Sequence, residues 1–121
     1  ADSVPIRHAL KSGNDKIIVV LTRNPGYRKK PVSKGTAKLY RKAYKSYPKM
    51  AACAVHRNRM YNRTMELVEK LEAEGRIYVI RPMVPTVSRL ERDYDKLMSF
   101  YEHGYALMKK EYANLLRYME E

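Results

Sequence analysis

The segment Lys16-Ile17-Ile18-Val19-Val20-Leu21-Thr22-Arg23 is the strongest indicator of fold class in this chain of 121 residues. Its five central residues are apolar, four of them are β-branched, and no polar residue alternates with them. Turn signals flank the run, Gly13-Asn14-Asp15 before it and Asn24-Pro25-Gly26 after it. Such a run is typical of a strand that is buried on both faces at the centre of a parallel sheet. The sequence therefore predicts an α/β fold.

One other segment has the same character, Arg76-Ile77-Tyr78-Val79-Ile80-Arg81. A central strand needs a neighbour on each side, and two strands do not supply that. We therefore expect the chain to be a fragment of a larger α/β domain. The chain begins with Ala1 instead of Met. That start fits a piece of a longer protein, although removal of an initiator Met produces the same start.

Helical patterns occupy the interval between the two predicted strands. Residues 36–47 predict a basic amphipathic helix whose inner face is rich in tyrosine. Pro48 is suited to begin a second helix, which Gly75 ends. A strand, two helices and a strand in this order predict two parallel strands joined by a long two-helix crossover. A short helix after Pro5 precedes the first strand.

The last part of the chain predicts a C-terminal helix that Asp93 or Asp95 caps. Its apolar residues recur at three- and four-residue spacing, which is the clearest helical period in the sequence. We expect this stripe to pack on the sheet or on a partner. It consists of Leu97/Met98, Tyr101, Tyr105, Met108, Tyr112, Leu115/Leu116 and Met119.

The net charge of +12 is concentrated in the first half of the chain. Residues 1–63 contain 16 Lys/Arg and two acids, whereas residues 64–121 contain 9 Lys/Arg and 11 acids. This asymmetry favours an anionic partner. The single cysteine, Cys53, forms no internal disulfide, and no apolar run approaches the roughly 18 residues of a membrane span. We therefore expect a soluble protein in a cytoplasmic setting.

The sequence contains no self-contained catalytic motif. Gly-x-Ser-x-Gly, Gly-x-Gly-x-x-Gly and a complete phosphate-binding loop are all absent. His8, His56 and His103 lie on three separate elements without metal-ligand spacing. We therefore predict no catalytic residue, no metal and no cofactor for this chain.

The segment from Arg23 to Lys49 contains ten Lys/Arg, no acid and several tyrosines. Three interpretations remain open. Cations with stacking aromatics suit nucleic acid. A basic amphipathic helix suits an anionic bilayer, to which the protein would attach peripherally. A solvated surface with inward tyrosines explains the pattern equally well.

Several segments resemble, in order and in spacing, the C-terminal part of bacterial patatin-like phospholipases, and the likeness covers nearly the whole chain. The first three are Asp2-Ser3-Val4-Pro5-Ile6, Gly13 to Arg23, and Gly26-Tyr27-Arg28-Lys29-Lys30-Pro31. The others are Tyr47-Pro48, Arg57, Tyr61-Asn62, Leu71-Glu72, Glu74-Gly75, Val79-Ile80-Arg81-Pro82 and Ser88-Arg89-Leu90-Glu91.

The resemblance implies a parent enzyme that hydrolyses lipid acyl esters with a Ser-Asp dyad. In that family the Ser lies in Gly-x-Ser-x-Gly and the Asp in Asp-Gly-Gly or Asp-Gly-Ala, and neither motif falls inside this chain. Asp2 precedes Ser3 instead of Gly, so it is not the catalytic Asp. Residues 1–35 would form the end of the patatin-like core, and residues 36–121 the C-terminal helices and the second strand.

The resemblance also implies that the chain is inactive alone and completes the sheet of the parent, with the N-terminal catalytic part as its partner. The isolated fragment is expected to expose the apolar edge or face that its missing neighbours cover, and either to self-associate or to be only marginally stable. We expect its basic face to bind anionic lipid headgroups, with a stand-alone nucleic-acid-binding module as the alternative. The predicted phosphate-contacting residues are Arg28, Lys29, Lys30, Lys34, Lys38, Arg41 and Lys42.

Overall fold

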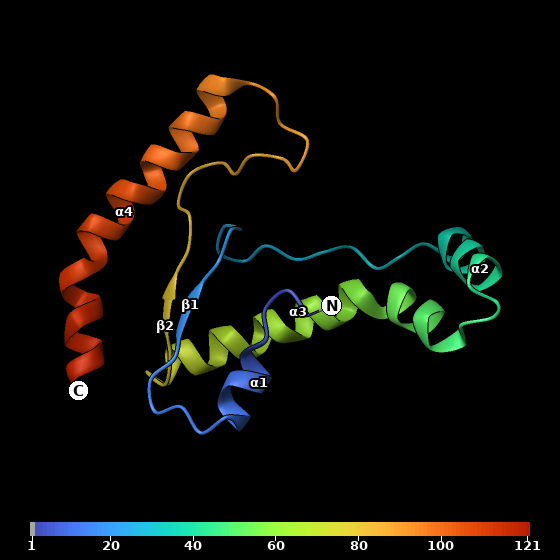
Figure 1. The fold of residues 1–121 in the computed structure, drawn as a ribbon, viewed down its shortest axis with the longest axis horizontal. Coiled ribbons are helices and arrows are strands. Elements are labelled where there is room, and N and C mark those ends of the chain that lie inside the picture. The colour runs from blue at the N-terminus through green and yellow to red at the C-terminus, as the bar shows by residue number, and fades with distance from the viewer. Residues whose placement is uncertain (1) are drawn as a thin grey trace. The chain divides into compact units, whose positions relative to one another are not determined.

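The computed structural model describes residues 2–121, and within them it contains four α-helices and two β-strands (Figure 1). The elements are α1 (Ile6–Lys11), β1 (Ile18–Val20), α2 (Lys34–Ala43), α3 (Pro48–Ala73), β2 (Tyr78–Ile80) and α4 (Tyr94–Glu120). The predicted mixed α/β class and the predicted order of the main elements are confirmed. None of the helices in the described part is both long and apolar enough to cross a membrane.

The two strands pair in parallel, as the sequence predicts. Ile18 faces Tyr78, Val19 faces Val79 and Val20 faces Ile80. The amide of Leu21 extends the pairing by donating to the carbonyl of Ile80 at 2.8 Å. Since α2 and α3 lie between the strands in the sequence, the predicted two-helix crossover is confirmed as well.

Burial of β1 differs from the prediction of a strand covered on both faces. Val19 is 8% exposed, but Ile18 is 39% and Val20 is 69% exposed. Within residues 2–121 the sheet has two strands, so β1 has one neighbour and its other edge stays open. This exposure is what the sequence predicts for the chain without the rest of its domain, and burial on both faces stays a prediction for the parent protein.

The ends of α3 follow from local sequence. Pro48 is its first residue, where the missing amide hydrogen costs no hydrogen bond. At the other end Gly75 has a φ of +71°. The Gly75 amide donates to the carbonyl of Glu72, and the Arg76 amide donates to the carbonyl of Leu71, each at 3.0 Å. This is the Schellman pattern, which favours glycine because only glycine adopts positive φ without strain.

The chain divides into two compact units. The first comprises residues up to Ile6 together with Arg28–Lys70, and the second comprises Arg7–Tyr27 together with Leu71–Glu121. The buried apolar residues of the first are Ile6, Ala37, Ala51, Met65 and Val68. Those of the second are Ile17, Val19, Leu71, Ile77 and Leu115. Each unit thus has a small core of its own.

In the first unit, α2 is shorter than predicted and shifted toward the N-terminus. The Ser33 hydroxyl caps it by accepting from the amide of Thr36 at 3.2 Å. Ala37 is its buried residue, whereas Tyr47, predicted as part of the inner face, lies beyond the helix and is 66% exposed. The predicted inner face is therefore wrong at Tyr47, because the helix ends before it, and also at Leu39, which lies on the helix and is 63% exposed.

In the second unit, α4 begins where predicted. The carboxylate of Asp93 accepts from the amides of Asp95 at 3.0 Å and Lys96 at 3.3 Å, which confirms the predicted cap. The predicted packing of the apolar stripe is not observed in this chain. Leu115 is its buried member, and six members are 40% exposed or more: Leu97, Tyr101, Tyr105, Tyr112, Leu116 and Met119.

A different face of α4 packs on the sheet. The Tyr78 hydroxyl of β2 donates to the Glu111 carboxylate, and the Tyr118 hydroxyl donates to the carbonyl of Arg76 at 3.1 Å. The rings of Tyr78 and Tyr118 lie 5.6 Å apart. The polar-tipped side chains of Tyr78 and Tyr118 therefore contribute to this contact, while six members of the apolar stripe stay exposed.

Candidate anion-binding surface

All seven predicted phosphate-contacting residues lie in the first unit. From Arg28 to Lys70 this unit contains 13 Lys/Arg and only two acids, Glu66 and Glu69, which gives a net charge of +11. From Lys34 to Arg63 there are nine Lys/Arg and no acid. A charge density of this kind produces a positive potential that attracts anions from a distance.

Side chains of α3 hold the basic loop that precedes α2. Asn62 accepts from the amide of Lys29 and donates to the carbonyl of Lys29, both at 2.8 Å. One turn earlier, Asn58 donates to the carbonyl of Lys30 at 2.8 Å. The backbone of residues 29–30 is therefore fixed by two asparagines at helical spacing.

Two of the predicted residues already have partners within this unit. Arg28 forms an ion pair with Glu69, with Nη2 and Oε2 2.7 Å apart. The Lys29 ammonium lies 4.4 Å from the centre of the Tyr61 ring. Both side chains are only partly exposed, so they are less available to an external anion than the other five.

The other five predicted residues are exposed. Lys30 lies in the loop, and the remaining four lie on α2, where spacings of four and three residues place them along one side. They are Lys34, Lys38, Arg41 and Lys42. The structure thus brings these four together on one helix.

This arrangement is unfavourable for the helix itself. Lys34 is the first residue of α2, whose first turn contains no acid, so its charge opposes the helix dipole. Lys34 with Lys38, and Lys38 with Lys42, are like-charged pairs four residues apart, each costing a few tenths of a kcal/mol. A helix that retains such a pattern gains from an external anion.

Sequence reasoning missed further cations of the same unit. Three of them lie on α3 and are exposed: Arg57, Arg59 and Arg63. They continue the acid-free stretch past Lys49, where the predicted basic segment ends. Because the sequence contains no acid between Lys49 and Arg63, the basic surface could have been predicted to extend to these arginines. Asn58 and Asn62 had no signal in composition or charge, since their role depends on contacts with a segment about 30 residues away.

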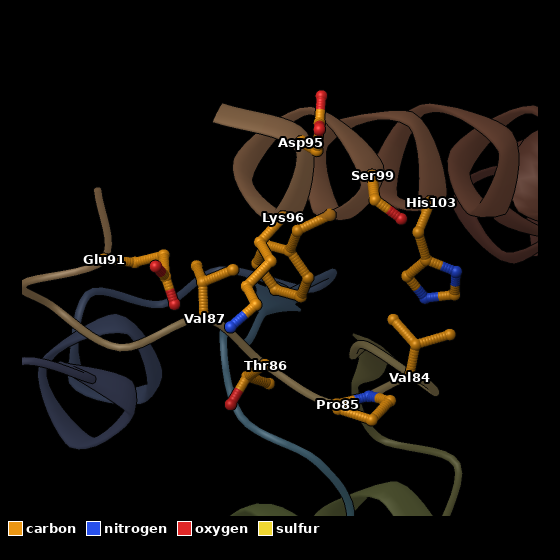
Figure 2. A pocket seen from close by; sticks show the side chains of 10 residues that line it. Val84, Pro85, Thr86, Val87, Glu91, Asp95, Lys96, Ser99 and His103 are labelled. Atoms are coloured by element: carbon orange, nitrogen blue, oxygen red, sulfur yellow. The ribbon is translucent and has the colours of Figure 1, made fainter. Parts of the chain in front are cut away.

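The second unit contains an open hollow of about 450 Å³ (Figure 2). The loop after β2 lines one side, with Val84, Pro85, Thr86, Val87 and Glu91, and the first half of α4 lines the other, with Asp95, Lys96, Ser99, Phe100 and His103. The Nε2 atom of His103 accepts from the amide of Met83 at 3.1 Å. This hydrogen bond links His103 of α4 to the start of the loop after β2.

The perturbed titrations belong to the sheet contact of the second unit. Burial, followed by the neighbouring Glu111 carboxylate, raises the pKa of Tyr78 to about 12. The hydrogen bond from Tyr78, followed by one from Asn114, lowers the pKa of Glu111. Both pKa shifts keep the phenol neutral and the carboxylate ionised in this hydrogen bond, which is a structural contact. Residues 2–121 contain no group of three or more His, Cys, Asp or Glu placed to hold a metal ion.

Residues 47–120 of the chain match a family model described as "Domain of unknown function (DUF6363)". This match covers all of α3, β2 and α4 and leaves α1, β1 and α2 outside. No curated protein and no solved structure matches the chain.

Proposed function

We propose that this chain, which belongs to the DUF6363 family, a domain of unknown function, is the non-catalytic C-terminal part of a patatin-like phospholipase. In this proposal residues 1–35 close the patatin-like core, and residues 36–121 form a C-terminal extension. The resemblance of the quoted segments supports the proposal. The uncovered face of β1 supports it further, because Ile18 and Val20 are apolar yet 39% and 69% exposed.

The role proposed for the chain is to present its basic unit to anionic phospholipid headgroups. The observation that carries this proposal is the row of four exposed cations on α2. Each Lys or Arg held near an anionic bilayer contributes about 1 kcal/mol at low salt. Four of them amount to about 4 kcal/mol, which is roughly a thousandfold in affinity.

Vesicle binding tests this role. The chain is titrated with vesicles of phosphatidylserine and phosphatidylcholine at low salt, beside a variant with Lys34→Glu, Lys38→Glu, Arg41→Glu and Lys42→Glu. A matched control makes the same charge change on exposed residues of the second unit, with Arg89→Glu, Arg92→Glu, Lys110→Glu and Arg117→Glu. The α2 variant should lose roughly a thousandfold, the control clearly less, and wild-type binding should weaken as salt screens the charges.

Equal losses in the two variants would mean that net charge alone drives binding, and unchanged binding in the α2 variant would refute the proposed surface. The alternative, a nucleic-acid-binding module, is tested in the same experiment with a single-stranded oligonucleotide as competitor. If the oligonucleotide binds more tightly than the vesicles, with affinity falling steeply as salt rises, the alternative replaces the membrane role.

The link to a phospholipase has a separate test. The gene should encode, upstream of the codon for Ala1, a Gly-x-Ser-x-Gly motif followed by Asp-Gly-Gly or Asp-Gly-Ala. A full-length protein with both motifs should hydrolyse phospholipid esters, and deletion of residues 1–121 should abolish that activity or the solubility of the enzyme. A start codon directly before Ala1 would contradict the parent enzyme.

A further inference from the structure

One face of α4 stays uncovered by residues 2–121, although it contains the strongest apolar pattern of the chain. Tyr94 is 70% exposed, Tyr101 64%, Tyr105 58% and Tyr112 56%. A continuous row of large exposed side chains on a long helix marks an interaction surface, since scattered apolar residues do not line up in this way.

The spacing of this row is symmetric. The apolar positions are residues 94, 97, 101, 105, 108, 112, 116 and 119, which are separated by 3, 4, 4, 3, 4, 4 and 3 residues. Spacings of 3, 4 and 4 form an 11-residue repeat, which keeps a row on one side of a helix that supercoils slightly with a right hand. Read from either end, the series of spacings is the same, so the row superposes on itself when the helix is reversed.

We propose that this face of α4, the α4 stripe, pairs with the α4 stripe of a second copy of the chain in an antiparallel helix pair. The two-fold axis passes between residues 106 and 107. In this register residue 94 lies level with residue 119 of the other copy, 97 with 116, 101 with 112, and 105 with 108. The inference concerns a different surface from the basic unit and does not depend on the proposed membrane role.

Charges beside the stripe fit this orientation. Glu102 and Lys109 are exposed and lie on the same side of the stripe, because they are seven residues, or two turns, apart. The Lys109 ammonium is 5.1 Å from the centre of the Tyr105 ring, at the border of the stripe. In the antiparallel register Lys109 reaches the level of residue 104 of the other copy, about 3 Å along the axis from Glu102. Two symmetric Glu102–Lys109 pairs then flank the two-fold axis.

The area available is sufficient for a specific interface. A tyrosine buries about 200 Å² when it is covered completely, and the four tyrosines of the stripe are more than half exposed. Covering them in both copies removes on the order of 1,000 Å² from solvent, before the leucines and methionines are counted, and that is the lower bound for a specific interface.

The oligomeric state is the first test. By sedimentation equilibrium the chain should have twice its mass of 14.2 kDa. Tyr105→Glu should shift it to the monomer mass without loss of helical circular dichroism, because this side chain is already exposed. Lys110→Glu, on the same helix but away from the stripe, and Val20→Lys, on the uncovered face of β1, should both leave the dimer intact. A monomer at every concentration, or a dimer that Val20→Lys abolishes and Tyr105→Glu does not, overturns the proposal.

Charge exchange tests the orientation. Glu102→Lys alone and Lys109→Glu alone should each weaken dimerisation about tenfold, since each places like charges on both sides of the axis. The double variant Glu102→Lys/Lys109→Glu should restore the wild-type dissociation constant. Additive losses in the double variant would contradict the antiparallel register.

Disulfide trapping gives an independent result on the same point. In a Cys53→Ser background, a mixture of Tyr101→Cys and Tyr112→Cys chains should oxidise to a disulfide between unlike chains. Residue 101 is about 16 Å along the axis from residue 101 of the other copy, too far for a disulfide. A predominant disulfide between two Tyr101→Cys chains would exclude the antiparallel pair.

Discussion

Asn62 is the residue whose loss should release the basic loop most directly. Its side-chain oxygen accepts from the amide of Lys29, and its side-chain nitrogen donates to the carbonyl of the same residue, both at 2.8 Å. Asn62→Ala removes both bonds. A net contribution of about 1 kcal/mol per bond gives about 2 kcal/mol for opening the loop. The cost does not rise further, because the site is partly exposed and water can replace the lost partner.

Amide hydrogen exchange of Lys29 measures this cost at the bond itself. Since the Lys29 amide donates to Asn62, its exchange rate should rise about 30-fold in Asn62→Ala, the factor that corresponds to about 2 kcal/mol. Asn58→Ala is the matched control on the same face of α3. It removes the bond to the Lys30 carbonyl and should leave the Lys29 amide protected, because that amide keeps its acceptor.

Two results would refute this account of the loop. Exchange of the Lys29 amide at the wild-type rate in Asn62→Ala would mean that the ion pair between Arg28 and Glu69 holds the loop without the asparagine. An equal acceleration in Asn58→Ala would mean that the loop opens as one cooperative segment, so that no single bond can be assigned to the Lys29 amide.

Two further predictions concern the second unit. Asp93→Ala should lower the free energy of unfolding by about 1 kcal/mol, since it removes the acceptor for the amides of Asp95 and Lys96. Asp93→Asn should lower it much less, because asparagine also caps helices. Equal losses of the two variants in urea unfolding would contradict the cap. Because the pKa of Glu111 is lowered in the folded protein, this carboxyl adds stability above its unfolded pKa near 4.5, and that stability is lost as the pH falls below 4.5. Because the pKa of Tyr78 is raised, this phenol adds stability below pH 10, and that stability is lost as the pH rises from 10 to about 12. Tyr78→Phe should flatten both limbs of a plot of stability against pH, and unchanged slopes would show that other groups produce them.

Local sequence rules account for most element boundaries. Pro48 begins α3, and Gly75 ends it, because the first needs no amide and the second adopts positive φ. Asp93 caps α4 for an equally local reason. The one misplaced helix is α2, whose start at Lys34 depends on the Ser33 cap, a signal that the charge and tyrosine pattern obscured. Its early end removed Tyr47 from the expected inner face.

The candidate site was predictable as a region of charge and not as a set of contacts. The acid-free run of cations is visible in composition alone, and the four cations of α2 share one side because helical spacing requires it. The partners of Arg28 and Lys29 were not predictable, since Glu69 and Tyr61 are more than 30 residues away in the chain. Charge counts treat all seven predicted residues alike, whereas the contacts show that Arg28 and Lys29 already have partners within the chain.

The sequence by itself determined the order of helices and strands, the parallel pairing of β1 with β2 and the location of the positive charge. These features follow from periodicity, turn residues and composition, which act within a few residues along the chain. The tertiary structure alone determined which apolar faces are covered. Ile18, Val20 and the α4 stripe have the pattern of buried residues and yet lie in solvent, because periodicity records that a face is apolar and carries no information about what packs on it.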